Sequence, residues 1–220
     1  MAANTVFSKG FFRDRDLDYQ TRSVLGRAVH GGSEVGEVLA TIDRVSDHES
    51  WRSEWGQTAD RVHSLGDGLR EQGDLASAAA AYLRAANYWA AVVESQSELE
   101  DERAPLAAFR AHRSCWDEFV DCSGGAHLRV DVPYDNGTLP GYLLRPDASG
   151  RRRPTLVITN GSDGALSSVW CDAGAGAVAR GWNAFVYDGP GQQSMLFERH
   201  TAFRPDWEAV LTPVIDTLVA

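Results

Sequence analysis

Two short apolar runs, each leading into a glycine-rich turn, constrain the fold of this chain more than any other feature. Residues 155–159 are almost wholly apolar and lead into a turn at 160–164, and residues 182–187 lead into a second turn at 188–191. Continuous apolar runs of this length are typical of parallel strands that are covered on both faces. The pattern between them, over residues 165–180, is helical, so we predict a β-α-β unit.

The first 122 residues have helical rather than strand periodicity. Trp51 and Trp55 recur at helical spacing, and Ser46 with Glu49 before them predicts a capping box that opens this helix. Gly73 and Asp74 are expected to end that helix and to cap an alanine-rich one, whose wide apolar face predicts burial against other helices. A further helix is expected from about residue 105 to residue 121.

The periodicity changes after residue 122. Apolar and polar residues alternate over 128–132, a turn signal follows at 135–137, and a return strand is expected at 139–144. An amphipathic helix is expected at 206–219. We therefore predict an α/β fold with two domains, a helical one over 1–122 and one over 123–220 that contains about four strands.

Composition narrows the classes of partner and compartment. The formal net charge of −10 argues against nucleic acid and against an anionic membrane, since both require clustered basic residues. The three cysteines form no CxxC pair, so we expect free thiols and no disulfide framework. With neither a signal-peptide pattern nor an apolar run of about 20 residues, we expect a cytoplasmic protein.

The turn at 160–164 is the first candidate site. Backbone N–H groups between a buried strand and a helix can bind developing negative charge, so we favour an oxyanion loop that uses the N–H of Ser162, with Gly161 next. Ser162 as a nucleophile is an alternative, but a nucleophile elbow has Gly where this chain has Asn160. A plain turn is the third reading.

The turn at 188–191 follows the second buried strand, at the edge of the sheet where α/β folds bind ligands. Its glycines and proline are expected to shape the pocket wall, although a purely structural turn is the alternative. The predicted pocket-shaping residues of both turns are Asn160, Asp163, Gly164, Asp188, Gly189, Pro190 and Gly191.

Other patterns predict less. Residues 174–179 match the dinucleotide fingerprint formally, but they precede a strand instead of following one, so close helix–sheet packing is the better explanation. The six histidines show no metal-ligand spacing: His112 and Cys115 share a helix face without a second pair. His200, near Glu198, is a tempting catalytic base, yet a lone loop histidine is more often polar surface. We expect neither a metal nor a cofactor.

The turns at 160–164 and 188–191, with the run that follows to Glu198 and the Phe-Arg-Pro-Asp-Trp segment at 203–207, resemble a known family. This family is the α/β-hydrolases with an N-terminal helical cap, the group of 2,6-dihydroxypseudooxynicotine hydrolase and related esterase-like proteins. The resemblance covers nearly the whole chain. It implies a helical cap followed by the first part of a hydrolase sheet, and it maps the oxyanion loop onto Asn160 to Gly164.

The resemblance also implies Ser-His-Asp chemistry on a small-molecule carbonyl substrate, either an ester or a carbon–carbon bond next to a ketone. The nucleophile strand of the family would follow the helix that ends near Val219, so no residue of this chain can be assigned as nucleophile, acid or base. We therefore expect a truncated chain that is inactive alone. The alternative is a non-enzymatic interaction protein or gene remnant, and a homodimer through the helices is plausible by resemblance.

Overall fold

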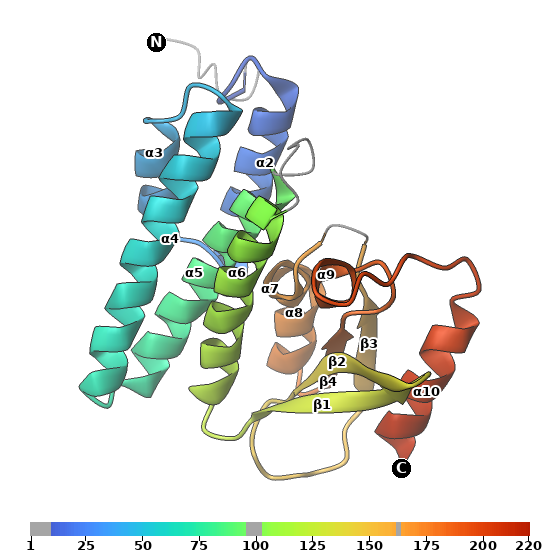
Figure 1. The fold of residues 1–220 in the computed structure, drawn as a ribbon. Helices are drawn as coiled ribbons and strands as arrows, with labels where there is room; N and C mark the ends of the chain where they lie inside the picture. The colour runs from blue at the N-terminus through green and yellow to red at the C-terminus, as the bar shows by residue number, and fades with distance from the viewer. Residues whose placement is uncertain (1–9, 96–102, 162–163) are drawn as a thin grey trace.

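The computed structural model describes residues 10–95, 103–161 and 164–220. Along the described chain, a group of helices comes first, a β-hairpin follows, and a β-α-β unit comes after the hairpin (Figure 1). In chain order they are α2 (Arg15–Gly26), η1 (Arg27–His30), α3 (Val35–Ile42), α4 (His48–Glu71), α5 (Leu75–Glu94), α6 (Arg103–Asp121), β1 (His127–Tyr134), β2 (Gly137–Leu144), β3 (Thr155–Thr159), α7 (Leu166–Val169), η2 (Trp170–Gly174), α8 (Ala175–Ala179), β4 (Asn183–Tyr187), α9 (Gln193–Phe197) and α10 (Glu208–Val219).

The strands of the described chain form one mixed sheet in the order β1-β2-β4-β3. The β1–β2 and β2–β4 pairs are antiparallel, whereas β3 and β4 are parallel and in register from Thr155 opposite Asn183 to Thr159 opposite Tyr187. This register confirms the predicted hairpin and β-α-β unit. Because Thr159 and Tyr187 are paired, the turns that follow them leave the sheet side by side.

Side chains of β4 alternate between two apolar layers. Ala184 and Val186 join the large cluster that also contains residues of α7, η2 and the helical bundle, whereas Phe185 and Tyr187 join a second cluster with α10. The sheet is therefore covered on both faces, with α7 and α8 between the strands and α6, and α10 on the opposite side (Figure 1). The period of two along the strand produces this division.

The helical bundle and the sheet share one apolar core. The Phe119 ring of α6 packs on Trp116, on His127 of β1 and on Trp170 of η2, with ring centroids 5.2, 5.4 and 5.7 Å apart. The last helix of the bundle, α6, ends at Asp121, and the first strand, β1, begins at His127. This boundary is close to the predicted division at residue 122. The independence of the two predicted domains stays a prediction, since this core crosses the junction.

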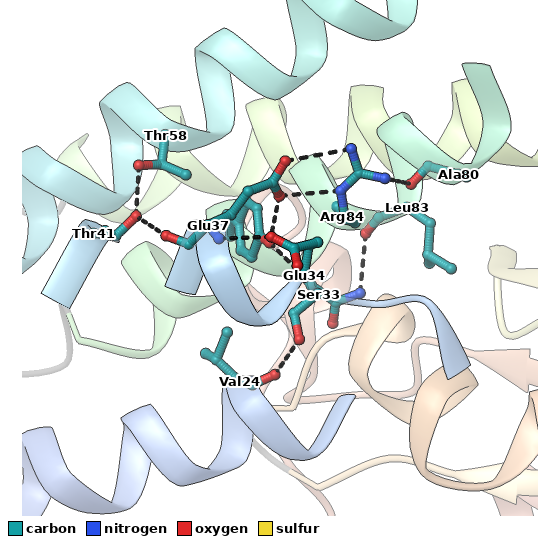
Figure 2. Close-up of polar contacts among 11 residues, drawn as sticks. Val24, Ser33, Glu34, Glu37, Thr41, Thr58, Ala80, Leu83 and Arg84 are labelled. Carbon is teal, nitrogen blue, oxygen red and sulfur yellow. Dashed lines mark hydrogen bonds and ion pairs between the residues drawn. The ribbon is translucent and has the colours of Figure 1, made fainter. Parts of the chain in front are cut away.

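A polar network holds α3 against α4 and α5 (Figure 2). The Glu37 carboxylate accepts hydrogen bonds from Arg84 Nε at 3.0 Å and from the Tyr88 hydroxyl at 2.7 Å. Thr41 and Thr58 join their hydroxyls at 2.8 Å across the α3–α4 contact. Burial raises the pKa of Tyr88, as does its bond to Glu37, so the phenol stays protonated and donates.

Local details differ from the sequence predictions in three places. The capping box of α4 consists of Asp47 and Ser50, one residue beyond the predicted pair, because it is the Asp47 carboxylate that accepts from the Ser50 N–H at 2.8 Å. Part of the loop expected after β4 forms the short helix α9. The central residues of β3 are half-buried instead of fully covered, because β3 has β4 on one side only within the described sheet.

Two other observations concern the chain as a whole. The cysteines Cys115, Cys122 and Cys171 are free and buried, as predicted. Among the described helices, none combines the length and apolar character that a membrane span requires.

Candidate functional site

The turn after β4 is built around a buried carboxylate. The Asp188 side chain is 0% exposed, and its Oδ2 accepts from the Ser194 backbone N–H at 3.2 Å and from the Ser194 hydroxyl at 2.6 Å. The Asp188 N–H donates to the Pro140 carbonyl at 3.0 Å, which extends the β2–β4 ladder by one residue. The carboxylate therefore links the end of β4 to the start of α9.

A guanidinium from the helical bundle neutralises this carboxylate. Arg113 Nη2 of α6 donates to Asp188 Oδ2, and the Arg113 side chain is only 15% exposed. The guanidinium also lies over the rings of Phe109 and Tyr142, at 5.2 and 5.7 Å from their centroids. Burial lowers the pKa of Arg113, but Asp188, Tyr142 and Asp117 together raise it by more, so the guanidinium stays charged beside the carboxylate.

The two turns are tied together by one side chain. Gln192 is fully buried, its Oε1 accepts from the Gly189 N–H at 2.8 Å, and its Nε2 donates to the Asn160 carbonyl at 2.5 Å. The first bond closes the turn after β4, and the second reaches the turn after β3. The structure thus brings Asn160 and Asp188 to the same edge of the sheet, as the sequence predicts.

The Asn160 side chain closes the turn after β3. Its Oδ1 accepts from the Gly161 N–H at 2.9 Å, and its Nδ2 donates to the Gly164 carbonyl. The Gly161 N–H is therefore engaged, and it can serve an oxyanion only if this bond opens. Ser162 and Asp163 lie outside the described residues, so the assignment of the Ser162 N–H as first oxyanion donor stays a prediction.

Close backbone approaches explain the glycines of the second turn. Gly191 has φ +79°, and a Cβ there would lie 2.6 Å from backbone atoms of Phe203. A Cβ at Gly189 would lie 2.8 Å from the Trp207 ring, which stacks on the Phe203 ring with centroids 4.9 Å apart. A side chain at either position would displace this aromatic pair, so both glycines fix the path between Asp188 and α10.

A serine–histidine pair lies behind the turn after β3. His112 Nε2 of α6 is 3.1 Å from the Ser167 hydroxyl of α7, and both side chains are fully buried. Burial lowers the pKa of His112 to about 3, so the imidazole is neutral. Within the described chain, Nδ1 has no hydrogen-bond partner and hence no orienting carboxylate. The pair therefore supports packing between α6 and α7 and does not form a triad.

Two other sequence candidates, His200 and the motif at 174–179, lie in surroundings that do not suggest catalysis or nucleotide binding. His200 is exposed in the loop after α9, and Glu198 near it pairs with Arg110 at 3.4 Å. A Cβ at Gly174 would lie 3.0 Å from Trp170 and 3.6 Å from Ala184, which agrees with close helix–sheet packing in the false dinucleotide motif.

The sequence reasoning missed Arg113 and the tying role of Gln192. Gln192 lies within the segment that carries the family resemblance, so the sequence pointed to this residue. Its hydrogen bond to the Asn160 carbonyl could not be predicted from that segment. Arg113 gave no local signal, because its partner is 75 residues away along the chain. Potential metal ligands of the described chain also converge unexpectedly, at His63, Cys115 and Glu118 of the helical bundle and not in the turns.

A groove of about 590 Å³ lies along β3 and α10, toward the amino ends of the parallel strands. Its wall includes Thr155, Val157, Asn183, Ile215 and Leu218. The turns at the carboxyl ends do not line it, so the groove is distinct from the candidate site.

The helical bundle, the mixed sheet and the two joined turns define an α/β-hydrolase-like fold. The solved structure of 2,6-dihydroxy-pseudo-oxynicotine hydrolase superposes with a TM-score of 0.73 at 18% identity, over 89% of this chain and 53% of that one. A second solved structure, AbyA5, superposes with a TM-score of 0.56 at 17% identity, over 93% of this chain and 52% of that one. No protein-family model matches the chain.

The amino-acid sequence is similar to those of several fungal hydrolases. Hydrolyase ccsE of Aspergillus clavatus is 33% identical over 217 residues, which cover 92% of this chain and 50% of that protein. Alpha/beta hydrolase xenA of Xenoacremonium sinensis is 31% identical over 219 residues, covering 97% and 50%. 20-Hydroxy-prefusarin hydrolase FUS2 of Gibberella moniliformis is 32% identical over 217 residues, covering 96% and 51%. These matches confirm the predicted resemblance to the α/β-hydrolases, and the chain spans about half the length of these relatives.

Proposed function

We propose that this chain supplies the cap and the oxyanion side of an α/β-hydrolase that acts on a small-molecule carbonyl compound. The observation that carries the proposal is the junction of the two turns, where Gln192 joins the Asn160 carbonyl to the turn of Asp188. A turn between a strand and a helix presents backbone N–H groups, which stabilise the charge that develops on a carbonyl oxygen. The fungal relatives named as hydrolases support the same reaction class.

The cap has a defined part in this proposal. Arg113 belongs to the helical bundle, yet its ion pair with Asp188 fixes the turn that forms one wall of the site. A cap held in this way can cover a bound substrate and exclude water. The substrate is an ester or a ketone with a cleavable neighbouring carbon–carbon bond, and its carbonyl oxygen is the atom that the turn after β3 receives.

The nucleophile, the orienting acid and the catalytic histidine are proposed to lie outside these 220 residues. Among the described residues, the one close serine–histidine pair is the buried Ser167 and His112, and it lacks a carboxylate at Nδ1. We therefore expect no saturable turnover of activated esters by the purified 220-residue chain. Saturable turnover that Ser162→Ala abolishes would contradict this expectation and would make Ser162 a nucleophile instead of an oxyanion donor.

The positive test uses the gene and the native protein. The DNA is sequenced beyond the Ala220 codon, and the molecular mass of the native protein, isolated from its source organism, is measured by mass spectrometry. A frame that continues into a strand with Gly-x-Ser-x-Gly gives a longer protein, whose ester and ketone hydrolysis can be screened. In that protein Gln192→Ala is expected to lower kcat by about 10-fold to 100-fold with little change in KM, because a displaced turn weakens transition-state binding more than substrate binding.

The non-enzymatic alternative remains testable. Residues 1–122 are expressed without the sheet, and their folding and self-association are measured by circular dichroism and analytical ultracentrifugation. A folded dimer of this segment would favour an interaction module. A segment that stays monomeric and binds no partner would remove the basis of this alternative.

A further inference from the structure

Three side chains with different donor atoms converge between α4 and α6. His63 comes from α4, and Cys115 and Glu118 come from α6, three residues apart on one face of the helix. One nitrogen, one sulfur and one carboxylate oxygen, one from each residue, lie within 4.8 Å of one another. The His63 Nε2 and Glu118 Oε2 atoms are 2.7 Å apart.

The donor types and spacing fit a tetrahedral transition metal. Zinc binds imidazole nitrogen at about 2.0–2.1 Å, carboxylate oxygen at about 2.0–2.2 Å and thiolate sulfur at about 2.3 Å, so its ligand atoms lie roughly 3.3–3.7 Å apart. For these atoms to hold zinc, the 2.7 Å between His63 Nε2 and Glu118 Oε2 has to open, and no separation in the present triangle exceeds 4.8 Å. A mixed nitrogen, sulfur and oxygen set favours Zn²⁺ over the hard cations Mg²⁺ and Ca²⁺.

The second nitrogen of the imidazole already faces a carboxylate. His63 Nδ1 is 3.6 Å from Asp67 Oδ2, one helical turn further along α4. The other oxygen of Asp67 accepts from the Tyr82 hydroxyl at 2.8 Å, and the Tyr82 ring packs against His63 with centroids 5.5 Å apart. Metal-binding histidines characteristically have such a carboxylate at the other nitrogen, which fixes the ring and leaves Nε2 to the metal.

Charge and access also favour a cation. The carboxylates of Glu118, Asp60 and Asp67 all act electrostatically on the Cys115 sulfur, so the three donor atoms lie in a negatively charged environment. His63 is 29% exposed and Glu118 is 23% exposed, whereas Cys115 is buried. A metal can therefore enter from solvent and keep a water molecule as its fourth ligand.

We propose that His63 Nε2, Cys115 Sγ and the Glu118 carboxylate form a zinc site that joins α4 to α6, with Asp67 orienting His63. Two residues before Cys115, α6 carries Arg113, whose guanidinium pairs with Asp188. A metal that fixes α6 against α4 therefore also fixes the helix that anchors the turn after β4. The site is separate from the proposed hydrolase chemistry and does not depend on it.

The test titrates Zn²⁺ into the tag-free, chelator-treated 220-residue chain, with calorimetry for stoichiometry and a competing chelator for affinity. One Zn²⁺ per chain is expected. The ligand variants His63→Gln and Glu118→Gln are expected to weaken zinc binding by about 100-fold. Asp67→Asn removes only the residue that orients His63, so a loss of affinity of about 10-fold is expected. The Glu118 side chain is in partial contact with solvent, so circular dichroism is expected to show a folded Glu118→Gln variant.

Cobalt identifies the sulfur ligand. Co²⁺ bound to the wild-type chain is expected to give a thiolate-to-cobalt charge-transfer band, which Cys115→Ser removes. The matched controls Cys122→Ser and Cys171→Ser change two other buried free thiols and are expected to keep the band. Binding of less than one metal per chain overturns the proposal, as does a band that survives Cys115→Ser or an affinity that Glu118→Gln leaves unchanged.

Discussion

The turns after β3 and β4 leave neighbouring parallel strands, yet they are held in different ways. The turn after β4 centres on Asp188, which is fully buried and receives an arginine from the helical bundle. The turn after β3 contains the exposed Gly161 and is closed by Asn160, an uncharged side chain. Gln192 connects the two. The comparison shows that the turn after β4 is held by a buried ion pair, whereas the described residues of the turn after β3 are held by uncharged hydrogen bonds.

The largest expected effect is on the turn after β4. Asp188→Ala removes one partner of a buried ion pair and leaves the Arg113 guanidinium without its counter-charge, so the free energy of unfolding is expected to fall by about 3–5 kcal/mol. Urea unfolding followed by tryptophan fluorescence measures this change. The control is Asp206→Ala, whose partner Arg204 is at the surface, with an expected effect below about 1 kcal/mol. Equal effects of the two substitutions would show that Asp188 is no anchor.

The backbone of the same turn gives the next largest effect. Gly191→Ala combines a left-handed φ of +79° with a contact against the Phe203 backbone, so a loss of about 2–4 kcal/mol is expected. Gly150 is the matched control, since its φ is +68° but no atom lies within 4 Å of a Cβ built there. Gly150→Ala is expected to cost about 1–2 kcal/mol for its conformation alone. If both variants lose the same stability in urea, the close approach to Phe203 has no energetic weight.

The pH dependence of stability probes the helix contact behind the turn after β3. Burial lowers the pKa of His112 from 6.5 to about 3, so between these pH values the unfolded chain binds a proton that the folded chain does not. Stability is therefore lost as the pH falls, by about 2–3 kcal/mol at pH 4.5 for this group, because a shift of one pKa unit equals about 1.4 kcal/mol.

The measurement is urea unfolding between pH 7 and pH 4.5. His112→Gln is expected to flatten the profile, although not completely, since burial also lowers the pKa of His127 to about 4. His200→Gln, at an exposed loop position, is the control and is expected to leave the slope unchanged. A profile that His112→Gln does not alter would show that the imidazole is hydrated and titrates normally.

The smallest effect concerns the link between the turns. Gln192→Ala removes the donor to the Asn160 carbonyl and the acceptor of the Gly189 N–H, so a loss of about 1–3 kcal/mol is expected. Apart from the Gly189 amide, which loses its acceptor directly, hydrogen exchange at residues 160–164 is expected to accelerate more than at residues 188–191. The exposed Gln57→Ala is the control and should leave exchange in both turns unchanged. Equal acceleration in the two turns would show that both depend on Gln192 to the same extent.

Much of the fold was predictable because it depends on local periodicity. The run at 155–159, the helix that follows and the run ending at Tyr187 each carry their own pattern, and the structure confirms all three. The resemblance to capped α/β-hydrolases was also visible in the turns themselves. The capping box of α4 was predicted one residue early, since Ser46, Asp47 and Ser50 all have side chains that can cap a helix.

The contacts that organise the site depend on packing between distant segments. The sequence determined that Asn160 and Asp188 each follow a strand, because strand patterns and turn residues are local properties. Only the tertiary structure decided that Arg113 neutralises Asp188, that His112 meets Ser167, and that His63 meets Cys115 and Glu118. Each of these pairings joins helices or strands whose relative positions follow from burial of the shared apolar core, and side-chain type alone does not encode them.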